Sequence, residues 1–333
     1  MHITNIKRVL FVLLLLSFLV GCASPVAPES VSVQLPNAST PIETSVEPYI
    51  AYTEEGCFQS QVETQTFLFF ACTQAHPATG DYSALTELFS GAVSGAGTPE
   101  LVLFGGDTIN NGWDAHEWQD FWDAATDPLY GLTTAAVAGN HDNHPLLAEQ
   151  FNYPDFVPTA QGEGFFYSLN TGLVHFLMLD SNIMGAGNER DIEWLRDELR
   201  SDASQNAAWR VAVMHHPMWT VMENPRDMRR AETMREYFLP LLEYYDVNLI
   251  LCGHQHVYSR TLPMSGDFIA EQDGIVQIMV ASGGKDTYTP GQHDYIAVYH
   301  RLRAYLVLTV TEDEFIVEAF DGEHNLIDNY VFT

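Results

Sequence analysis

The stretch VNLILCGHQHVYSR, residues 247–260, shows the pattern from which the fold can be inferred. An apolar run long enough for a buried strand stops at Gly253, and His254 and His256 follow in the spacing H-x-H. An apolar run ending in a polar cluster also occurs in TFLFFA-CTQAH (66–76), ELVLF-GGDTINNG (100–112), TTAAVA-GNHDNH (133–144) and WRVAVM-HHP (209–217). Because ligands in open α/β sheets lie beyond the carboxyl ends of strands, we expect these clusters to meet at one site.

Helical patterns separate these runs, which indicates an α/β fold. They lie near 81–95, 115–126, 190–201 and 228–245. After about residue 270 the pattern changes to strands joined by short turns, which we expect to be antiparallel: IVQIMVAS, YIAVYH, AYLVLTVT, EFIVEAF and LIDNYVFT. A mostly parallel sheet and an antiparallel one, with helices outside both, predict a four-layer α/β/β/α sandwich of two mixed sheets.

The first 21 residues have the features of a signal peptide. Lys7 and Arg8 supply positive charge, and residues 9–20 form an apolar core too short to span a bilayer comfortably. The ending LVGC resembles the lipobox of bacterial lipoproteins, in which the cysteine, here Cys22, is lipidated and becomes the mature N-terminus. An ordinary secretory peptide and a short N-terminal anchor remain alternatives. We expect an exported protein, lipid-anchored to a bacterial membrane at the cell surface or on the periplasmic face.

The composition limits the remaining organisation of the chain. Residues 22–48 are rich in proline and contain no aromatic residue, which predicts a disordered tether before one folded domain over 49–333. The net charge of −30, from 14 Lys and Arg against 44 Asp and Glu, argues against nucleic-acid binding. Besides Cys22 only Cys57, Cys72 and Cys252 are present, which excludes a dense disulfide framework but leaves a Cys57–Cys72 bridge open. Cys252 reads as a buried thiol, and no protein partner is evident.

The polar residues at the strand ends form a candidate metal site. Imidazole, carboxylate and carboxamide groups suit Zn, Fe, Mn or Ni, and one carboxylate can bridge two ions. An H-x-H pair can aim its two rings at adjacent ions, and two metals about 3.5–4 Å apart clamp a phosphoryl group. The residues are Asp107, Asn140, His141, His215, His254 and His256.

The ordered motifs GGD, GNHD, HHP and GHQH resemble those of the calcineurin-like metallophosphoesterase superfamily. The segments YSLNTGLVHFLMLDSN, DIEWLRDEL, MHHPMWT and LCGHQHVYSR also resemble small, single-domain purple acid phosphatases. The resemblance covers roughly residues 66–333. It implies the metallophosphoesterase fold and two divalent or trivalent metal ions, drawn from Fe, Zn, Mn and Ni.

The resemblance assigns roles to the candidate residues. Asp107 bridges the two metals, and the second metal is completed by Asn140, His215 and His254. His256 faces the first metal. His141 contacts the scissile phosphate and protonates the leaving oxygen, with Asp142 orienting it or, alternatively, capping the following helix. His216 lies next to a ligand position and is a further substrate-binding candidate, although an ordinary structural role is favoured.

The chain departs from the family at the first motif. An aspartate is expected after the first strand, but Cys72 stands there in the register favoured by strand length, with Gln74 two residues later. A shifted register puts Gln74 at the aspartate position and His76 as the histidine. The first metal therefore has Cys72, Gln74 or His76 as its uncertain donors. Asn110 occupies the position of the tyrosine of the purple enzymes, so no tyrosinate-to-iron colour is expected.

These observations predict a metal-dependent hydrolase of phosphate mono- or diesters of small substrates at the cell surface. The resemblance implies that a metal-bound hydroxide attacks phosphorus. The alternative is a catalytically weak or silent phosphate-ester-binding lipoprotein on the same scaffold, because both registers lose a carboxylate.

Overall fold

The computed structural model describes residues 63–151, 166–271 and 273–333. The signal peptide, Cys22, the tether, the domain boundary at residue 49 and Cys57 lie outside these ranges, and the expectations made for them stay predictions. No helix in the described part of the chain is long and apolar enough to cross a membrane.

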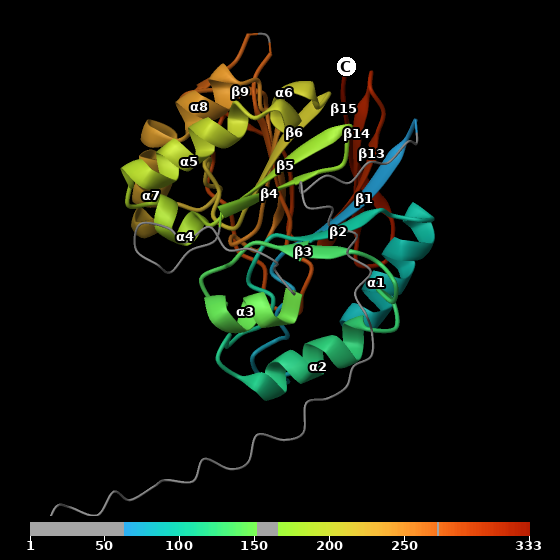
Figure 1. Cartoon of the computed structure of the whole chain (residues 1–333). Helices are drawn as coiled ribbons and strands as arrows, with labels where there is room; N and C mark the ends of the chain where they lie inside the picture. The colour runs from blue at the N-terminus through green and yellow to red at the C-terminus, as the bar shows by residue number, and fades with distance from the viewer. Residues whose placement is uncertain (1–62, 152–165, 272) are drawn as a thin grey trace, which may run out of the picture. The chain divides into compact units, whose positions relative to one another are not determined.

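Two large mixed sheets form the centre of the described domain (Figure 1). The first sheet has the order β15 (Leu326–Phe332), β14 (Phe315–Asp321), β13 (Ala304–Val310), β1 (Gln65–Phe70), β2 (Leu101–Phe104) and β3 (Thr134–Ala136). The second has the order β12 (Ile296–His300), β8 (Tyr258–Thr261), β11 (Val276–Met279), β7 (Leu249–Cys252), β6 (Trp209–Met214), β5 (Val174–Leu179) and β4 (Phe166–Asn170). A small hairpin joins β9 (Met264–Ser265) to β10 (Phe268–Ile269).

Helices cover the outer face of each sheet. The first sheet packs against α1 (Ser83–Ala96), α2 (Ala115–Ala125) and α3 (His144–Phe151). The second packs against α4 (Ser181–Met184), α5 (Glu189–Leu199), α7 (Pro225–Tyr237) and α8 (Leu239–Tyr244), with the short α6 (Asp202–Asn206) after α5. The predicted four-layer α/β/β/α sandwich is confirmed.

The alternation of β1 shows how the sequence specifies these layers. Phe67 and Phe69 point into the core between the sheets, where Phe67 meets Phe176 edge to face at a centroid distance of 5.1 Å. Leu68 and Phe70 point the other way, into the cluster beneath the first three helices. Because successive side chains of a strand face opposite sides, a continuous apolar run is needed where both faces are buried.

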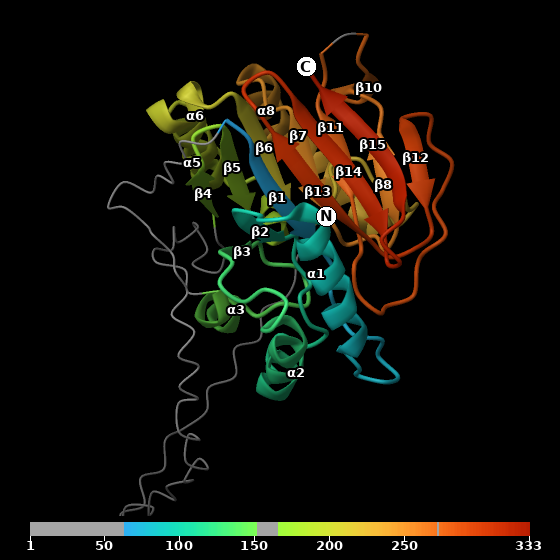
Figure 2. The same ribbon diagram turned by 90° about the vertical axis from the view of Figure 1, so that its right-hand side faces the viewer.

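The division into one parallel and one antiparallel sheet is wrong in detail. The antiparallel strands β13, β14 and β15 continue the first sheet from β1 (Figure 2). In this pairing Phe67 of β1 lies opposite Leu308 of β13. The strand β11, expected to be antiparallel, runs parallel to β7 and antiparallel to β8. The antiparallel strands β13 and β8 thus pair with β1 and β11, whose outer edges would otherwise expose backbone N–H and C=O groups.

One predicted helix is divided. The pattern near 228–245 becomes α7 and α8, which meet at Phe238. Pro240 stands in the first turn of α8, where its missing N–H costs nothing. Inside a continuous helix the same proline would remove a backbone hydrogen bond.

A largely buried ion pair joins strand β8 of the second sheet to strand β15 of the first. Arg260 on β8 contacts Asp328 on β15 through two hydrogen bonds, Nε to Oδ2 at 2.7 Å and Nη2 to Oδ1 at 3.2 Å. The Tyr258 hydroxyl donates to the same carboxylate at 2.7 Å. Burial raises the pKa of Asp328, but these hydrogen bonds outweigh it and hold the pKa below its usual value.

We expect Asp328→Asn to lower the free energy of unfolding by about 2 kcal/mol, because a largely buried guanidinium loses its carboxylate. Urea unfolding at pH 7 measures the loss, with Asp313→Asn in an exposed turn as the control. Since the pKa of Asp328 is lowered on folding, the difference should be constant above about pH 4 and shrink at lower pH. Equal midpoints for the two variants at pH 7 would contradict this account.

Candidate metal centre

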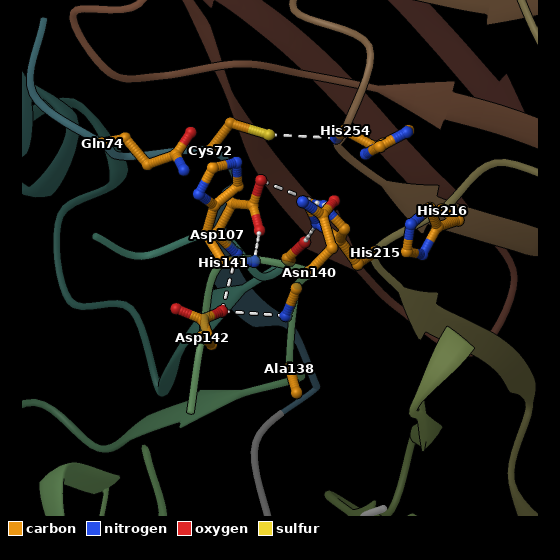
Figure 3. Close-up of polar contacts among 12 residues, drawn as sticks. Cys72, Gln74, Asp107, Ala138, Asn140, His141, Asp142, His215, His216 and His254 are labelled. Atoms are coloured by element: carbon orange, nitrogen blue, oxygen red, sulfur yellow. Dashed lines mark hydrogen bonds and ion pairs between the residues drawn. The ribbon is translucent and has the colours of Figure 1, made fainter. Parts of the chain in front are cut away.

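The carboxyl ends of β1, β2, β3, β6 and β7 deliver polar side chains to one place (Figure 3). The donor atoms of Cys72, Asp107 and His215 all lie within 4.8 Å of one another. Those of His215, His216 and His254 form a second such group. The predicted convergence of these strand ends is therefore present in the structure.

Glycine permits the close approach of the loops after β2 and β3. A Cβ atom at Gly139 would lie 2.2 Å from both the backbone nitrogen and Oδ1 of Asp107. Asp107 itself has a left-handed backbone, with φ of 54°. Gly106 has φ of 81°, and a Cβ atom there would lie 2.7 Å from the backbone nitrogen of Gly139, so both motifs need glycine where the two loops meet.

Asp107 lies at the middle of the group and is almost fully buried. Its Oδ1 accepts a hydrogen bond from the backbone N–H of His141 at 2.8 Å, and its Oδ2 lies 3.3 Å from Nε2 of His215. Burial raises the pKa of Asp107, but His215 and His141 outweigh that effect, so the net shift is downward and the carboxylate is ionised.

The surroundings of His215 fit a metal ion. Nδ1 lies 2.9 Å from the carbonyl oxygen of Gly105, which can only accept, so Nδ1 carries a hydrogen. Nε2 faces two oxygens at 3.3 Å, Oδ2 of Asp107 and Oδ1 of Asn140. If the His215 ring is neutral, the lone pair of Nε2 points toward the lone pairs of these two oxygens, and the three atoms repel one another. A cation bound among them would remove this repulsion. Burial lowers the pKa of His215, but Asp107 outweighs it and raises the pKa overall.

His254 and His256 show the same arrangement. Nε2 of His254 lies 3.2 Å from Oδ2 of Asp227, so Nδ1 is the ring nitrogen that would bind a metal ion. Nδ1 of His256 lies 3.2 Å from the carbonyl oxygen of Asp286, and its ring stacks on Tyr288. Burial lowers the pKa of His256 to about 4 and also lowers that of His254, so both rings are neutral, as metal ligands must be.

His141 lies at the exposed edge of the centre. Its Nδ1 is 2.7 Å from the carbonyl oxygen of Asn110, which leaves Nε2 to meet a substrate. Asn110 is in turn held by Glu117 of α2, whose Oε1 accepts from its backbone N–H at 2.8 Å and from Nδ2 at 2.9 Å. The orienting partner of His141 is therefore a backbone carbonyl fixed by Glu117.

Asp142 has a different role from either one predicted. Its carboxylate accepts hydrogen bonds from the backbone N–H groups of Asp107, Thr108 and Gly139, at 2.7, 3.0 and 2.8 Å. It therefore ties the loop after β2 to the loop after β3. The side chain that accepts from the first turn of α3 is Asn143, through Leu146 N–H at 3.2 Å. Burial and the neighbouring Asp107 raise the pKa of Asp142 to about 6.

His216 shares a donor group with His215 and His254, but both of its ring nitrogens contact neighbouring side chains. It is buried, its Nδ1 lies 2.9 Å from the Ser181 hydroxyl, and its Nε2 contacts the Arg230 guanidinium. Burial and nearby cationic groups hold its pKa well below the usual value. His216 therefore supports Arg230, in keeping with the structural role that the sequence favours.

The two registers considered for the first motif differ in whether Cys72 or His76 lies beside Asp107. The side chain of His76 is 40% exposed, and its nearest charged partner is Asp286, with Nε2 to Oδ1 at 3.9 Å. Cys72 is buried, is a free thiol and lies in the donor group with Asp107. Burial and Asp107 raise the pKa of Cys72 well above its usual value. The structure thus brings the Cys72 sulfur, and not the His76 ring, into the donor group around Asp107.

Asp227 is a functional residue that the sequence analysis missed. It lies in the first turn of α7 and fixes His254, so its loss should let the imidazole rotate and weaken metal binding. We expect Asp227→Asn to reduce the affinity of the second metal about 10–100-fold. Competition with a chromophoric chelator measures it, with Asp197→Asn on the exposed face of α5 as the control. Identical affinities in both variants would show that Asp227 does not orient this ligand.

Residues 65–258 match the family model described as calcineurin-like phosphoesterase. Purple acid phosphatase 23 of Arabidopsis thaliana is 26% identical over 185 residues, which cover 54% of this chain and 39% of that protein. The probable inactive purple acid phosphatase 9 of the same plant is 26% identical over 184 residues, covering 53% and 27%. The chain thus spans less than half the length of these relatives.

Two solved structures share the fold. A purple acid phosphatase from yellow lupin seeds, PPD1, superposes with a TM-score of 0.65 and 18% identity, covering 82% of this chain and 54% of that one. GAP50, described as the anchor in the inner membrane complex of Plasmodium, superposes with a TM-score of 0.61 and 13% identity, covering 81% and 88%. At such identities the likeness concerns the arrangement of the elements alone.

Proposed function

The chain belongs to the calcineurin-like phosphoesterase family, and we propose that it hydrolyses phosphate mono- or diesters of small substrates with the help of bound metal ions. The observation that carries the proposal is the arrangement of His141, His215, His254 and His256. Each ring has one nitrogen beside an oxygen of a neighbouring residue, which leaves the other nitrogen for a ligand or a substrate. A set of imidazoles around a buried carboxylate is suited to transition metals.

The chain's own residues divide the work. Asp107, Asn140, His215 and His254 would hold the second metal, and Asp107 with His256 would face the first. When bound, the metal ions supply Lewis-acid activation of the phosphoryl group and of the attacking water. Asp142 keeps the two central loops together, and burial of Asp107 keeps its charge effective in a medium of low dielectric constant.

His141 would act on the substrate itself. Because Nδ1 donates to the carbonyl oxygen of Asn110, a hydrogen on Nε2 makes the ring a cation that can protonate the leaving oxygen. The carbonyl contact also fixes the direction of the ring, so that proton transfer needs no search for the right rotamer. The Glu117–Asn110 pair keeps that carbonyl in place.

Hydrolysis by the full chain tests the proposal. Turnover of p-nitrophenyl phosphate or its bis ester should fall at least about 100-fold after chelation and return when Zn, Mn, Fe or Ni is added. The control is the chelated protein with Mg²⁺ alone, which prefers oxygen ligands. Failure of every metal to give turnover would reject the hydrolase.

A binding protein is the second candidate. It is favoured by Cys72 at the position of an expected aspartate and by the similarity to a probable inactive relative. It predicts that metal-loaded protein binds phosphate without releasing p-nitrophenol. Calorimetry with inorganic phosphate, run beside the turnover assay, separates the two candidates.

We propose further that the protein is exported and lipid-anchored through Cys22. The proposal is supported by the apolar segment after Lys7 and Arg8 and by the LVGC ending. Cys22→Ser should move the protein out of the membrane fraction, because it removes the thiol that would carry the lipid anchor. Cys57→Ser is the control, and the same fractionation for both variants would contradict the anchor.

A further inference from the structure

The first-metal side of the centre contains a thiol and a carboxamide in one loop. Cys72 and Gln74 follow β1, and both are almost completely buried. The sulfur of Cys72 belongs to the donor group with the carboxylate of Asp107 and the imidazole of His215, all within 4.8 Å. A simple core cysteine has no need of such neighbours, because burial beside a carboxylate adds nothing to apolar packing.

Gln74 supplies the second observation. Its Nε2 donates to the carbonyl oxygen of Ile109 at 3.2 Å, but its Oε1 has no hydrogen-bond partner within the described part of the chain. A buried acceptor without a partner costs about 1–3 kcal/mol. A metal ion on the same side as Cys72 would satisfy this oxygen.

A neighbouring loop holds both residues in place. The backbone N–H of Gly283 donates to the carbonyl of Cys72 at 2.9 Å, and that of Gly284 donates to the carbonyl of Gln74 at 2.7 Å. The same loop continues to Asp286, whose carbonyl fixes Nδ1 of His256. Cys72, Gln74 and His256 thus all contact one segment, residues 283–286.

The sulfur is also an acceptor in this arrangement. The backbone N–H of His254 points at Sγ of Cys72 with a distance of 3.0 Å, shown in Figure 3. Metal binding breaks the S–H bond, releases the proton to solvent and forms a sulfur–metal bond.

We infer that Sγ of Cys72 and Oε1 of Gln74 are ligands of the first metal ion, together with Asp107 and His256, and that this ion is a borderline-soft divalent cation such as Zn²⁺. The inference rests on the proposed metal centre but not on turnover. Thiolate ligation favours Zn over a hard trivalent ion. The cysteine thereby replaces the charge of the carboxylate that the family has at this position.

Cobalt substitution of the full chain tests the inference. Two Co²⁺ per chain should bind and give a thiolate-to-cobalt charge-transfer band in the near ultraviolet. Cys72→Ser should abolish the band and weaken the first Co²⁺ at least about 10-fold. The matched control is Cys252→Ser, which changes the other buried free thiol but in the apolar core beneath the helices of the second sheet. It should keep the band.

Two further variants protect the test against a folding defect. Cys72→Asp should bind two Co²⁺ without the band, because a carboxylate replaces the thiolate. Gln74→Leu should keep the band but weaken the first Co²⁺ by about 10-fold. An unchanged affinity in Gln74→Leu would remove Gln74 from the ligand set.

Absence of the band at two Co²⁺ per chain, or its survival in Cys72→Ser, would overturn the inference. The proposed function has its own readout. A band without ester turnover would support the thiolate ligand and reject the hydrolase, and turnover without a band would do the reverse.

Discussion

Asp107→Asn should deprive the protein of bound metal and lower kcat/KM for phosphate esters at least about 1,000-fold. Asp107 is the buried carboxylate that lies beside both His215 and the His141 backbone. Asparagine keeps the size of the side chain and can keep the hydrogen bond from His141, so the fold should survive. The charge that two cations need between them is lost.

Metal content and turnover, measured on the same samples, check this expectation. Asp191→Asn is the control, because Asp191 is equally buried but lies on α5 away from the centre. Circular dichroism verifies that both variants are folded. An Asp107→Asn protein that retains two metals and normal turnover would show that this carboxylate does not bridge them.

His141→Gln should separate catalysis from metal binding. The ring lies outside the ligand groups and is held through Nδ1 by Asn110, so its loss should leave the metal content unchanged. Removal of a general acid lowers kcat by about 100- to 10,000-fold. Esters with good leaving groups should be affected least, because they need little protonation.

Steady-state kinetics with p-nitrophenyl phosphate and an alkyl phosphate test the second expectation. His116→Gln, an exposed histidine of α2, provides the control. If kcat falls equally for both leaving groups, His141 stabilises the phosphoryl group instead of protonating the leaving oxygen. If it does not fall for either, His141 has no part in the reaction.

The convergence of the candidate ligand residues could be predicted because each one follows a buried strand. Both faces of the parallel strands are buried, so each strand is a continuous apolar run that can be recognised locally. These runs end just before Asp107, Asn140, His215 and His254. Carboxyl ends of parallel strands lie at one edge, so sequence order is enough to bring these residues together.

The residues that orient the ligands could not be predicted in this way. Asp227 reaches His254 from the first turn of α7, and Asp286 reaches His256 from a loop after β11. Both contacts depend on how helices and loops pack over the sheet edge. Asp227 acts through its carboxylate and Asp286 through its backbone carbonyl, and no local pattern marks either residue among the 44 acidic residues of the chain.

The predictions for Asp142 and for the sheet pairing were wrong because they also depend on contacts between distant parts of the chain. Asp142 follows His141 directly, but its carboxylate turns toward the backbone N–H groups of two loops that only tertiary structure brings close. The pairing of β13 with β1 is equally non-local, because an apolar alternation specifies a strand without its neighbour. The break between α7 and α8, in contrast, has a local signal in Pro240, which the prediction of one helix over 228–245 did not take into account.

The metal content of the full chain shows whether the candidate centre binds two ions. Elemental mass spectrometry of the purified protein, supplemented with Zn, Mn, Fe or Ni, counts the ions, and p-nitrophenyl phosphate and its bis ester report turnover of the same sample. The account predicts two ions per chain and hydrolysis of at least one ester. No bound metal and no hydrolysis under any supplement would contradict it.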